Sequence, residues 1–270
     1  MEDVSIRFLD GEPDAGILRR LYDTVIAPSF SPAEREPLER LRRVLAADEL
    51  HGAIAVTPDG EPVGALFLEW FGDIRAALLC YFAVRPDLRG SGIGRRLVAV
   101  AGPHWRATLR PHVVFAEAED PLRPGDDPLE PGDDPLEPGD DPLERGDDRA
   151  GNEDAAADYG DDDARLRLYA GFGGRRVPVP YLLPELSPGA GRLSGLLLLV
   201  IESDDVVSPT TDRIRSTIVT DFLVRYFARL EGHEVGEVHA GGKGDDGRLR
   251  QLLAECRRAD FLPLVPLSEG

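Results

Sequence analysis

A turn rich in glycine and arginine lies where a predicted strand meets a predicted helix, and its residue types suit anion binding. Residues 81–97 read YFAVRPDLRGSGIGRRL. Glycines let a backbone approach a ligand closely, while free N–H groups and the helix dipole favour negative charge. Arg89 and Arg95 add positive charge, and each charge-assisted hydrogen bond can contribute about 1.5–3 kcal/mol. The stretch therefore predicts a phosphate or pyrophosphate site.

Two common phosphate-binding motifs do not fit the chain. A Walker A loop needs Gly-Lys followed by Ser or Thr, but the chain's Lys243 is followed by Gly244. A dinucleotide fingerprint needs a third glycine three residues after the second, where Arg95 or Leu97 stands instead. The predicted anion site therefore belongs to neither of these two nucleotide-binding motifs.

The spacing Arg89-x-x-Gly92-x-Gly94 resembles the acyl-CoA loop of the GNAT N-acetyltransferase family. The preceding Val84-x-Pro86 and the following residues 95–97 are also typical of that family. The resemblance implies acetyl-CoA as co-substrate. It places the CoA moiety on Phe82, Val84, Arg89, Gly90, Ser91, Gly92, Ile93, Gly94 and Arg95.

A second, independent match is Leu168-Tyr169 with Gly173 four residues after the tyrosine. The family's usual phenylalanine after that glycine is replaced by Gly174. The resemblance implies that Tyr169 protonates the leaving thiolate, and the alternative is a tyrosine that packs its helix on the sheet. It covers about residues 4–186.

An amine acceptor needs a general base, because an alkyl ammonium of pKa about 10.4 costs roughly 4–5 kcal/mol to deprotonate at pH 7. Glu117 ends a predicted strand that should neighbour the central strand, and Glu69 lies in a strand on its other side. Both are candidate bases, and the alternative for each is a solvated acid at a strand end.

The acceptor site is expected between the first two helices and the later strands. Phe30, Glu34, Trp70 and Tyr81 are the candidate substrate-binding residues, and Ser29 and Glu36 fall in the same region. Capping of a helix or packing in the core would explain the same residue types.

Hydrophobic spacing predicts the elements that would position these residues. Strands are expected at 4–9, 51–57, 62–71, 76–84, 113–118, 175–183 and 193–201, and helices at 14–26, 32–47, 93–109, 165–172, 214–230 and 249–258. Ser31-Pro32 and residues 208–212 have the composition of helix starts, and Gly232 that of a helix end. We expect an α/β fold with a mixed, mostly antiparallel GNAT-type central sheet flanked by helices.

Residues 119–163 form an acidic insertion. They contain 19 acids and three arginines, and so hold most of the net charge of −19. A seven-residue unit, Asp-Asp-Pro-Leu-Glu-Pro-Gly, begins at Asp126 and recurs at Asp133 and, with one change, at Asp140. Proline, glycine and like charges predict a disordered loop, and a calcium site is the alternative.

The domain expected at 1–203 is the acyltransferase, including that insertion. Residues 204–270 form a C-terminal extension with a long amphipathic helix. That helix must bury a wide apolar face, either against its own sheet or against a second copy of the chain in a homodimer. Two distant cysteines and the lack of a signal peptide favour a reducing, cytoplasmic location. The longest apolar run, residues 196–201, is too short for a membrane span.

Five scattered histidines lack metal-ligand spacing, so no metal is expected, and a near-neutral fold with an acidic loop argues against nucleic acid. The sequence therefore favours direct transfer of an acetyl group from acetyl-CoA to a small-molecule amine in a ternary complex. A peptide or protein acceptor, a longer acyl-CoA donor and a catalytically silent binding module remain alternatives. The sequence does not identify the acceptor.

Overall fold

The computed structural model describes residues 4–9, 11, 14–121, 162–187, 189, 191–240 and 247–267, without the side chains of 162–164. Nearly all of the predicted acidic insertion lies outside the described residues. The strands are β1 (Ser5–Leu9), β2 (Leu50–Val56), β3 (Pro62–Phe71), β4 (Ala76–Val84), β5 (Val113–Glu119), β6 (Arg175–Val177), β7 (Leu196–Ser203), β8 (Arg213–Arg215), β9 (Phe261–Pro263) and β10 (Val265–Pro266). The helices are α1 (Ala15–Leu21), α2 (Leu38–Ala46), α3 (Ile93–Thr108), α4 (Asp162–Gly171), α5 (Ser216–Glu231), α6 (Val235–His239) and α7 (Gly247–Cys256).

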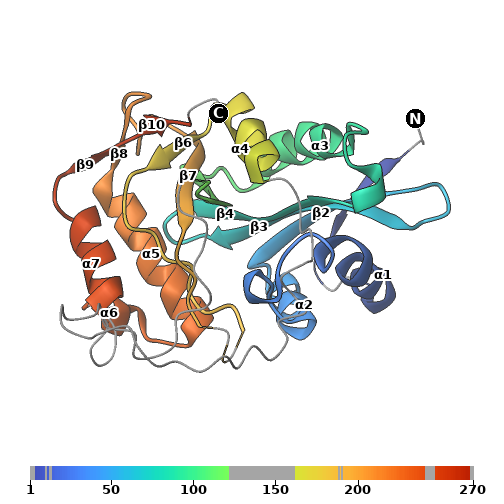
Figure 1. Ribbon diagram of the computed structural model, residues 1–270, viewed down its shortest axis with the longest axis horizontal. Helices are drawn as coiled ribbons and strands as arrows, with labels where there is room; N and C mark the ends of the chain where they lie inside the picture. The colour runs from blue at the N-terminus through green and yellow to red at the C-terminus, as the bar shows by residue number, and fades with distance from the viewer. Residues whose placement is uncertain are drawn as a thin grey trace, which may run out of the picture.

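Eight strands form one twisted sheet in the order β1-β2-β3-β4-β5-β7-β6-β10. Every neighbouring pair is antiparallel except β4 and β5, which run parallel. Helices cover both faces, with α3 and α4 on one side and α1, α2 and α5 on the other (Figure 1). The predicted mixed, mostly antiparallel sheet flanked by helices is confirmed for the described residues.

Four clusters of buried side chains hold the helices on the sheet. On one face, α1 and α2 pack over β2 to β4, while α5 and α7 pack over β5 and β7. On the other face, α3 covers β2 to β4 and α4 lies over β5 and β7. Because each face is divided between two helical layers, the boundary between the layers runs along β4 and β5.

The parallel pair β4–β5 is joined along only part of its length. The paired residues run from Ala76 with Val113 to Leu79 with Ala116, and the pairing ends there. Next along β4, Cys80 is the extra residue of a bulge, because Phe67 pairs with Tyr81 and Leu68 with Leu79. A bulge kinks its strand and increases the local twist. The ends of β4 and β5 therefore separate beyond Leu79.

The predicted helix over 32–47 begins later than expected. Ser31 and Glu34 form a capping box, but it caps only a 3₁₀ turn, Pro32–Glu34, and the backbone is extended at Arg35. Proline at 37 disfavours helical geometry in the residue before it. The α-helix α2 therefore starts at Leu38.

The helix start predicted at residues 208–212 is also wrong. The Ser208 hydroxyl donates to the carbonyl oxygens of Thr210 and Arg213, which closes a turn. That turn leads into β8, and α5 begins at Ser216. Gly232 ends the helix as predicted, with a left-handed φ of 67°.

The predicted strand at 175–183 is too long. Only Arg175–Val177 joins the sheet, because Pro178 and Pro180 have no N–H group to donate to a ladder. The N–H groups of Val179 and Tyr181 donate instead to carbonyls two residues earlier. The short elements α6, β8, β9 and β10 were not predicted.

Candidate active site

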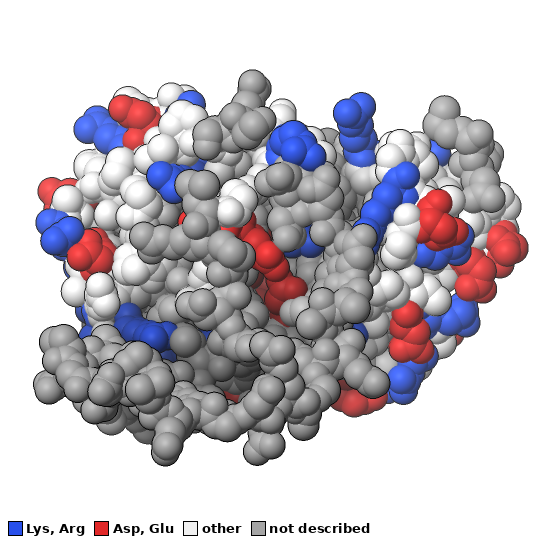
Figure 2. Space-filling view, viewed as in Figure 1, with Lys and Arg blue, Asp and Glu red and all other residues white. Residues whose placement is uncertain are grey.

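A pocket that opens to solvent lies where β4 and β5 separate. Side chains from both faces of the sheet line it. Tyr81 and Tyr226 come from the face covered by α1, α2 and α5, and Phe82 and Tyr169 from the face covered by α3 and α4. Acidic atoms lie near the centre of the face seen in Figure 2. The separated strands thus open a passage through the sheet.

Glu117 on β5 is the carboxylate best placed in this pocket. The Tyr181 hydroxyl donates a hydrogen bond to Oε1, and the Tyr226 hydroxyl donates to Oε2 at 3.4 Å. Burial raises the pKa of Glu117 to about 7, although the two hydrogen bonds lower it. A carboxyl group with a pKa near neutrality is suited to accept a proton at physiological pH.

Glu69, the second candidate base, lies beside the pocket and not in its lining. It is 2% exposed, and its Oε1 is 3.1 Å from Nη1 of Arg229 on α5 and 3.7 Å from Nη2 of Arg40 on α2. Burial raises the pKa of Glu69 in spite of both arginines. The contacts of this carboxylate thus join two helices to the sheet.

Glu36 lines the pocket and joins the same network through an ion pair with Arg40. Burial first, and then the charge of Glu69, raises the pKa of Glu36 to about 8 in spite of the arginine. The Glu36 N–H donates to the Tyr81 hydroxyl at 2.8 Å. Because that hydroxyl accepts this bond, its own proton remains available for another acceptor.

Tyr169, from α4, lines the pocket on the opposite face of the sheet from Tyr226. The side chain is 3% exposed. Burial raises the pKa of Tyr169 to about 12, so the phenol keeps its proton throughout the neutral range. Gly174, where the family pattern has phenylalanine, lies tightly against this tyrosine. A Cβ at Gly174 would come 2.7 Å from the carbonyl oxygen of Tyr169.

The predicted phosphate loop connects β4 to α3. Gly92 caps α3 in a left-handed conformation with φ 88°, and Gly90 has φ 77°. Within the described part of the chain, the N–H groups of Gly92, Ile93 and Gly94 have no hydrogen-bond acceptor. A Cβ at Gly94 would approach Cζ of Phe82 to 3.1 Å, so glycine allows the strand and the helix to meet closely. The geometry suits an anion held by backbone donors.

The side chains of this loop differ in their positions. Arg89 and Arg95 are exposed, and Nη2 of Arg89 lies 3.4 Å from the Ser29 hydroxyl. The Ser91 hydroxyl donates to the Leu88 carbonyl at 2.6 Å. The side chain of Ile93, the first residue of α3, is buried between that helix and the sheet. Ile93 could therefore contribute to a ligand site only through its backbone. Phe82 lines the pocket, and Val84 packs in the cluster under α3.

Three of the four candidate acceptor residues line the pocket. Phe30 packs edge-on against Tyr81, with ring centroids 5.2 Å apart, and Arg165 lies 5.4 Å above the Phe30 ring. Glu34, the third, accepts a hydrogen bond from the Ser31 N–H at 3.0 Å. Trp70 instead packs with the cluster on the α3 side of the sheet.

Sequence reasoning missed Tyr181 and Tyr226 as site residues. Tyr226 falls in the helix expected at 214–230, and Tyr181 in the strand expected at 175–183. The four-residue spacing of α5 predicts that Tyr226 is buried, but it does not predict which strand residue the hydroxyl meets. That contact depends on how α5 docks on the sheet.

Within the described residues, no group of three or more His, Cys, Asp or Glu side chains is arranged to hold a metal ion. Nor does any helix among them combine the length and the apolar character needed to cross a membrane.

Comparison with known proteins adds a family match. Residues 18–104 match the model of the acetyltransferase (GNAT) family. No curated protein sequence matches the chain.

Similar solved structures include a protein from Bacteroides thetaiotaomicron assigned to the GNAT acetyltransferases (19% identity, TM-score 0.47, 73% of this chain and 87% of that one). Another is an acetyltransferase from Streptococcus agalactiae, with 13% identity and a TM-score of 0.46 over 74% of this chain and 98% of that one. A third is a spermidine/spermine N-acetyltransferase from Vibrio cholerae, with 13% identity and a TM-score of 0.41 over 73% of this chain and 92% of that one. At these identities and TM-scores the likenesses add no argument of their own.

Proposed function

We propose that this chain, an acetyltransferase whose residues 18–104 belong to the GNAT family, moves an acetyl group from acetyl-CoA to the amino group of a small molecule. One observation carries the proposal. The pocket between β4 and β5 brings Glu117 and Tyr169 together from opposite faces of the sheet. A donor can thus approach from the α3–α4 face and an acceptor from the other.

The donor's pyrophosphate would bind the N–H groups of Gly92, Ile93 and Gly94, which have no acceptor in the described part of the chain. Arg89 and Arg95 would add charge to that site. The pantetheine arm would then lie along the separated end of β4, near Phe82 and Val84. There, backbone N–H groups can polarise the thioester carbonyl.

In the reaction, Glu117 takes a proton from the ammonium group, directly or through one water. The nitrogen lone pair attacks the thioester carbon and forms a C–N bond. When the tetrahedral intermediate collapses, the C–S bond breaks, the electron pair leaves with the CoA sulfur, and the nitrogen gives up its second proton to the leaving thiolate or to solvent. The acetyl group passes directly to the amine, and the products are an acetamide and CoA.

Tyr169 would donate a hydrogen bond to the leaving sulfur. Its pKa of about 12 lies well above that of an ordinary thiol, about 8.5. Complete proton transfer from the phenol to the thiolate is therefore unfavourable. A role in stabilising the thiolate through a hydrogen bond fits this residue better than a role as a full proton donor.

The character of the pocket supports a small cationic amine as acceptor. Four glutamates line it, at positions 34, 36, 117 and 119, and Arg165 is the one arginine or lysine among the lining residues that the structure describes. Carboxylate oxygens can accept hydrogen bonds from an ammonium group, and those that are ionised favour it over an anionic acceptor.

Calorimetric titration with acetyl-CoA tests the proposal, with Arg89→Glu as the variant and Arg7→Glu as the matched control. Arg7 is exposed on the edge strand β1, at one end of the sheet. Wild type and Arg7→Glu should bind with micromolar affinity, while Arg89→Glu should lose binding because it places negative charge beside the phosphate.

A screen of amines for release of the CoA thiol would follow. If neither the wild type nor the control binds acetyl-CoA, the acetyltransferase function is wrong. Binding without turnover of any amine would favour a catalytically silent module.

A further inference from the structure

The carboxylate of Glu117 is held by two hydroxyls from segments that come later in the chain. Tyr181 donates to Oε1 from the segment between β6 and β7, and Tyr226 donates to Oε2 from α5. Both oxygens of the candidate base are thus engaged by hydroxyls from two separate segments of the chain.

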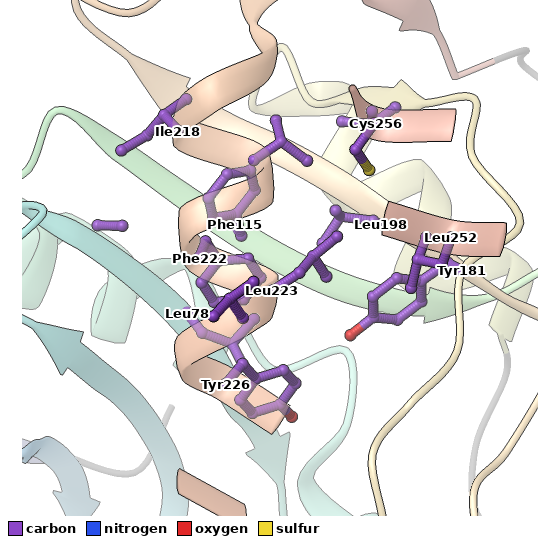
Figure 3. Close-up of a cluster of buried hydrophobic side chains, with 14 of the residues drawn as sticks. Leu78, Phe115, Tyr181, Leu198, Ile218, Phe222, Leu223, Tyr226, Leu252 and Cys256 are labelled. Atoms are coloured by element: carbon purple, nitrogen blue, oxygen red, sulfur yellow. The ribbon is translucent and has the colours of Figure 1, made fainter. Parts of the chain in front are cut away.

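Both tyrosine rings are fixed by packing. Tyr226 is 2% exposed and stacks on Phe222, with centroids 5.4 Å apart, while Phe71 meets it edge-on at 6.3 Å. Tyr181 is 4% exposed in the same apolar cluster. Figure 3 shows the two rings among these core side chains, with both hydroxyls at the rim of the cluster. The hydroxyl positions are therefore set by the core.

Burial alone requires each phenol hydroxyl to have a hydrogen-bond acceptor. That need does not explain why two phenols from different segments share one carboxylate that faces a pocket. In this arrangement the carboxylate cannot rotate without losing a hydrogen bond, and the bonds favour its ionised form. Both effects act on the group that would remove the proton.

We propose that Tyr181 and Tyr226 are positioning residues that hold Glu117 in one orientation and keep it ionised for proton removal. The proposal rests on the proposed function. It also makes the C-terminal segment part of the active site, because α5 supplies one of the two hydroxyls. Each tyrosine acts on the reaction through its hydrogen bond to Glu117.

Other titratable groups also act on Glu117. Glu34, Glu36 and Glu69 disfavour its charge, and the Cys80 thiol and Tyr169 lie near enough to interact with it. None of these groups is changed by removing a hydroxyl from position 181 or 226. A shift in the titration of Glu117 in such variants therefore reports the hydrogen bonds themselves.

The test is a carbon-13 titration of the glutamate side-chain carboxyls, with the Glu117 signal assigned by its loss in Glu117→Gln. Wild type should titrate near pH 7. Tyr181→Phe and Tyr226→Phe keep the packed rings and remove one donor each. Each should therefore move the midpoint to higher pH, by about one unit. The acid limb of kcat/KM should move with it.

Thr220→Val is the matched control. It removes a buried hydroxyl from the same helix, and that Oγ1 makes no hydrogen bond in the described part of the chain. The control should leave the Glu117 midpoint unchanged.

An unmoved midpoint in both phenylalanine variants would overturn the inference and leave the proposed function standing. The proposed function can also fail while the inference about the tyrosines stands. A chain that acetylates no amine would contradict the proposed function, while the carboxyl titration would still show whether the tyrosines hold Glu117.

Discussion

At the scale of single residues, Glu69 is buried and Glu117 is half-buried on neighbouring parts of the sheet, and the two glutamates have different surroundings. Glu117 faces the pocket and contacts two neutral phenols. Glu69 faces the arginines of two helices. The difference predicts that one acts on substrate protons and the other holds the fold together.

Glu117→Gln should lower kcat/KM for an amine acceptor by about 10²–10⁴-fold, the usual contribution of a general base. In the wild type, the rate should rise with pH through about 7, because the base acts only when ionised and its pKa is about 7. The remaining activity of the variant should lack that limb. A pH–rate profile measures both effects.

Glu69→Gln is the comparison for that profile. It should keep the limb, moved to lower pH because the charge of Glu69 no longer raises the pKa of Glu117, and it should reduce thermal stability because Arg229 and Arg40 lose a buried partner. If Glu69→Gln abolished the limb and Glu117→Gln kept it, the assignment of the base would be reversed.

Tyr169→Phe should lower kcat more than it raises the KM for acetyl-CoA, because the hydroxyl would act on the sulfur only as the C–S bond breaks. A loss of about 10–100-fold corresponds to one hydrogen bond to a charged group. Steady-state kinetics with varied acetyl-CoA separate the two parameters. A change confined to KM would show that the tyrosine only helps to bind the donor.

The sequence predicted several of these residues but not their contacts. Glu117, Tyr169, Tyr81 and Phe30 all line the pocket, because strand alternation and motif spacing restrict which residues can face it. Tyr181 could not be predicted in the same way. Its position depends on an irregular segment between Pro180 and β7, which has no periodic pattern.

At the scale of elements, the junction between β4 and α3 depends on glycines with left-handed φ angles. Gly92→Ala would force a side chain into φ 88°, at a cost of about 1–2 kcal/mol. Its affinity for acetyl-CoA should fall by about tenfold, because the N–H groups shift from their positions. Calorimetry measures the change.

Gly60→Ala controls for backbone strain alone, since Gly60 has φ 89° in the turn between β2 and β3. It should lower the melting temperature without changing the affinity for acetyl-CoA. Equal loss of affinity in the two variants would rule out a specific role for Gly92.

The predicted elements were most accurate where periodicity was long and least accurate where capping residues alone marked a start. The strands β2 to β5 and the helix α3 lie within one or two residues of their predicted ranges. At Ser31 and Ser208 the polar residues satisfy local turns instead of α-helices. Such side chains stabilise a turn and a helix start by the same hydrogen bonds, so composition does not distinguish them.

At the scale of the whole molecule, the buried carboxylates should make stability depend on pH. The pKa of Glu36 rises from 4.5 to about 8 in the folded protein, so the folded state binds this proton more tightly than the unfolded state. The resulting stabilisation is complete below pH 4.5 and is lost as pH rises through about 8. Glu117 acts in the same direction up to about pH 7.

Glu36→Gln should therefore flatten the pH dependence of stability. Between pH 6 and pH 9 its free energy of unfolding should fall by less than that of the wild type. Glu39→Gln, at an exposed position on α2, is the matched control and should change nothing. Denaturant unfolding at pH 6 and pH 9 provides the comparison. A wild type equally stable at both values would contradict the expectation.

The predicted boundary at residue 203 separates two parts of the chain that share one core. Ile218, Phe222 and Leu223 of α5 pack in one cluster with Phe115 and Leu198 of the sheet. Each large apolar side chain contributes about 1.5–3 kcal/mol when buried, and a whole domain is stable by only about 5–15 kcal/mol.

A fragment ending at residue 203 would lose more than this apolar cover. Arg229 would no longer pair with Glu69, so a buried carboxylate would lose a cation 3.1 Å away. The strand β10, which pairs with β6 at the edge of the sheet, would also be missing. We expect fragment 1–203 to be unfolded or aggregated, as judged by circular dichroism and amide NMR. A dispersed amide spectrum, together with acetyl-CoA binding, would instead show that the first part folds alone and that the tyrosine from α5 was added to a complete site.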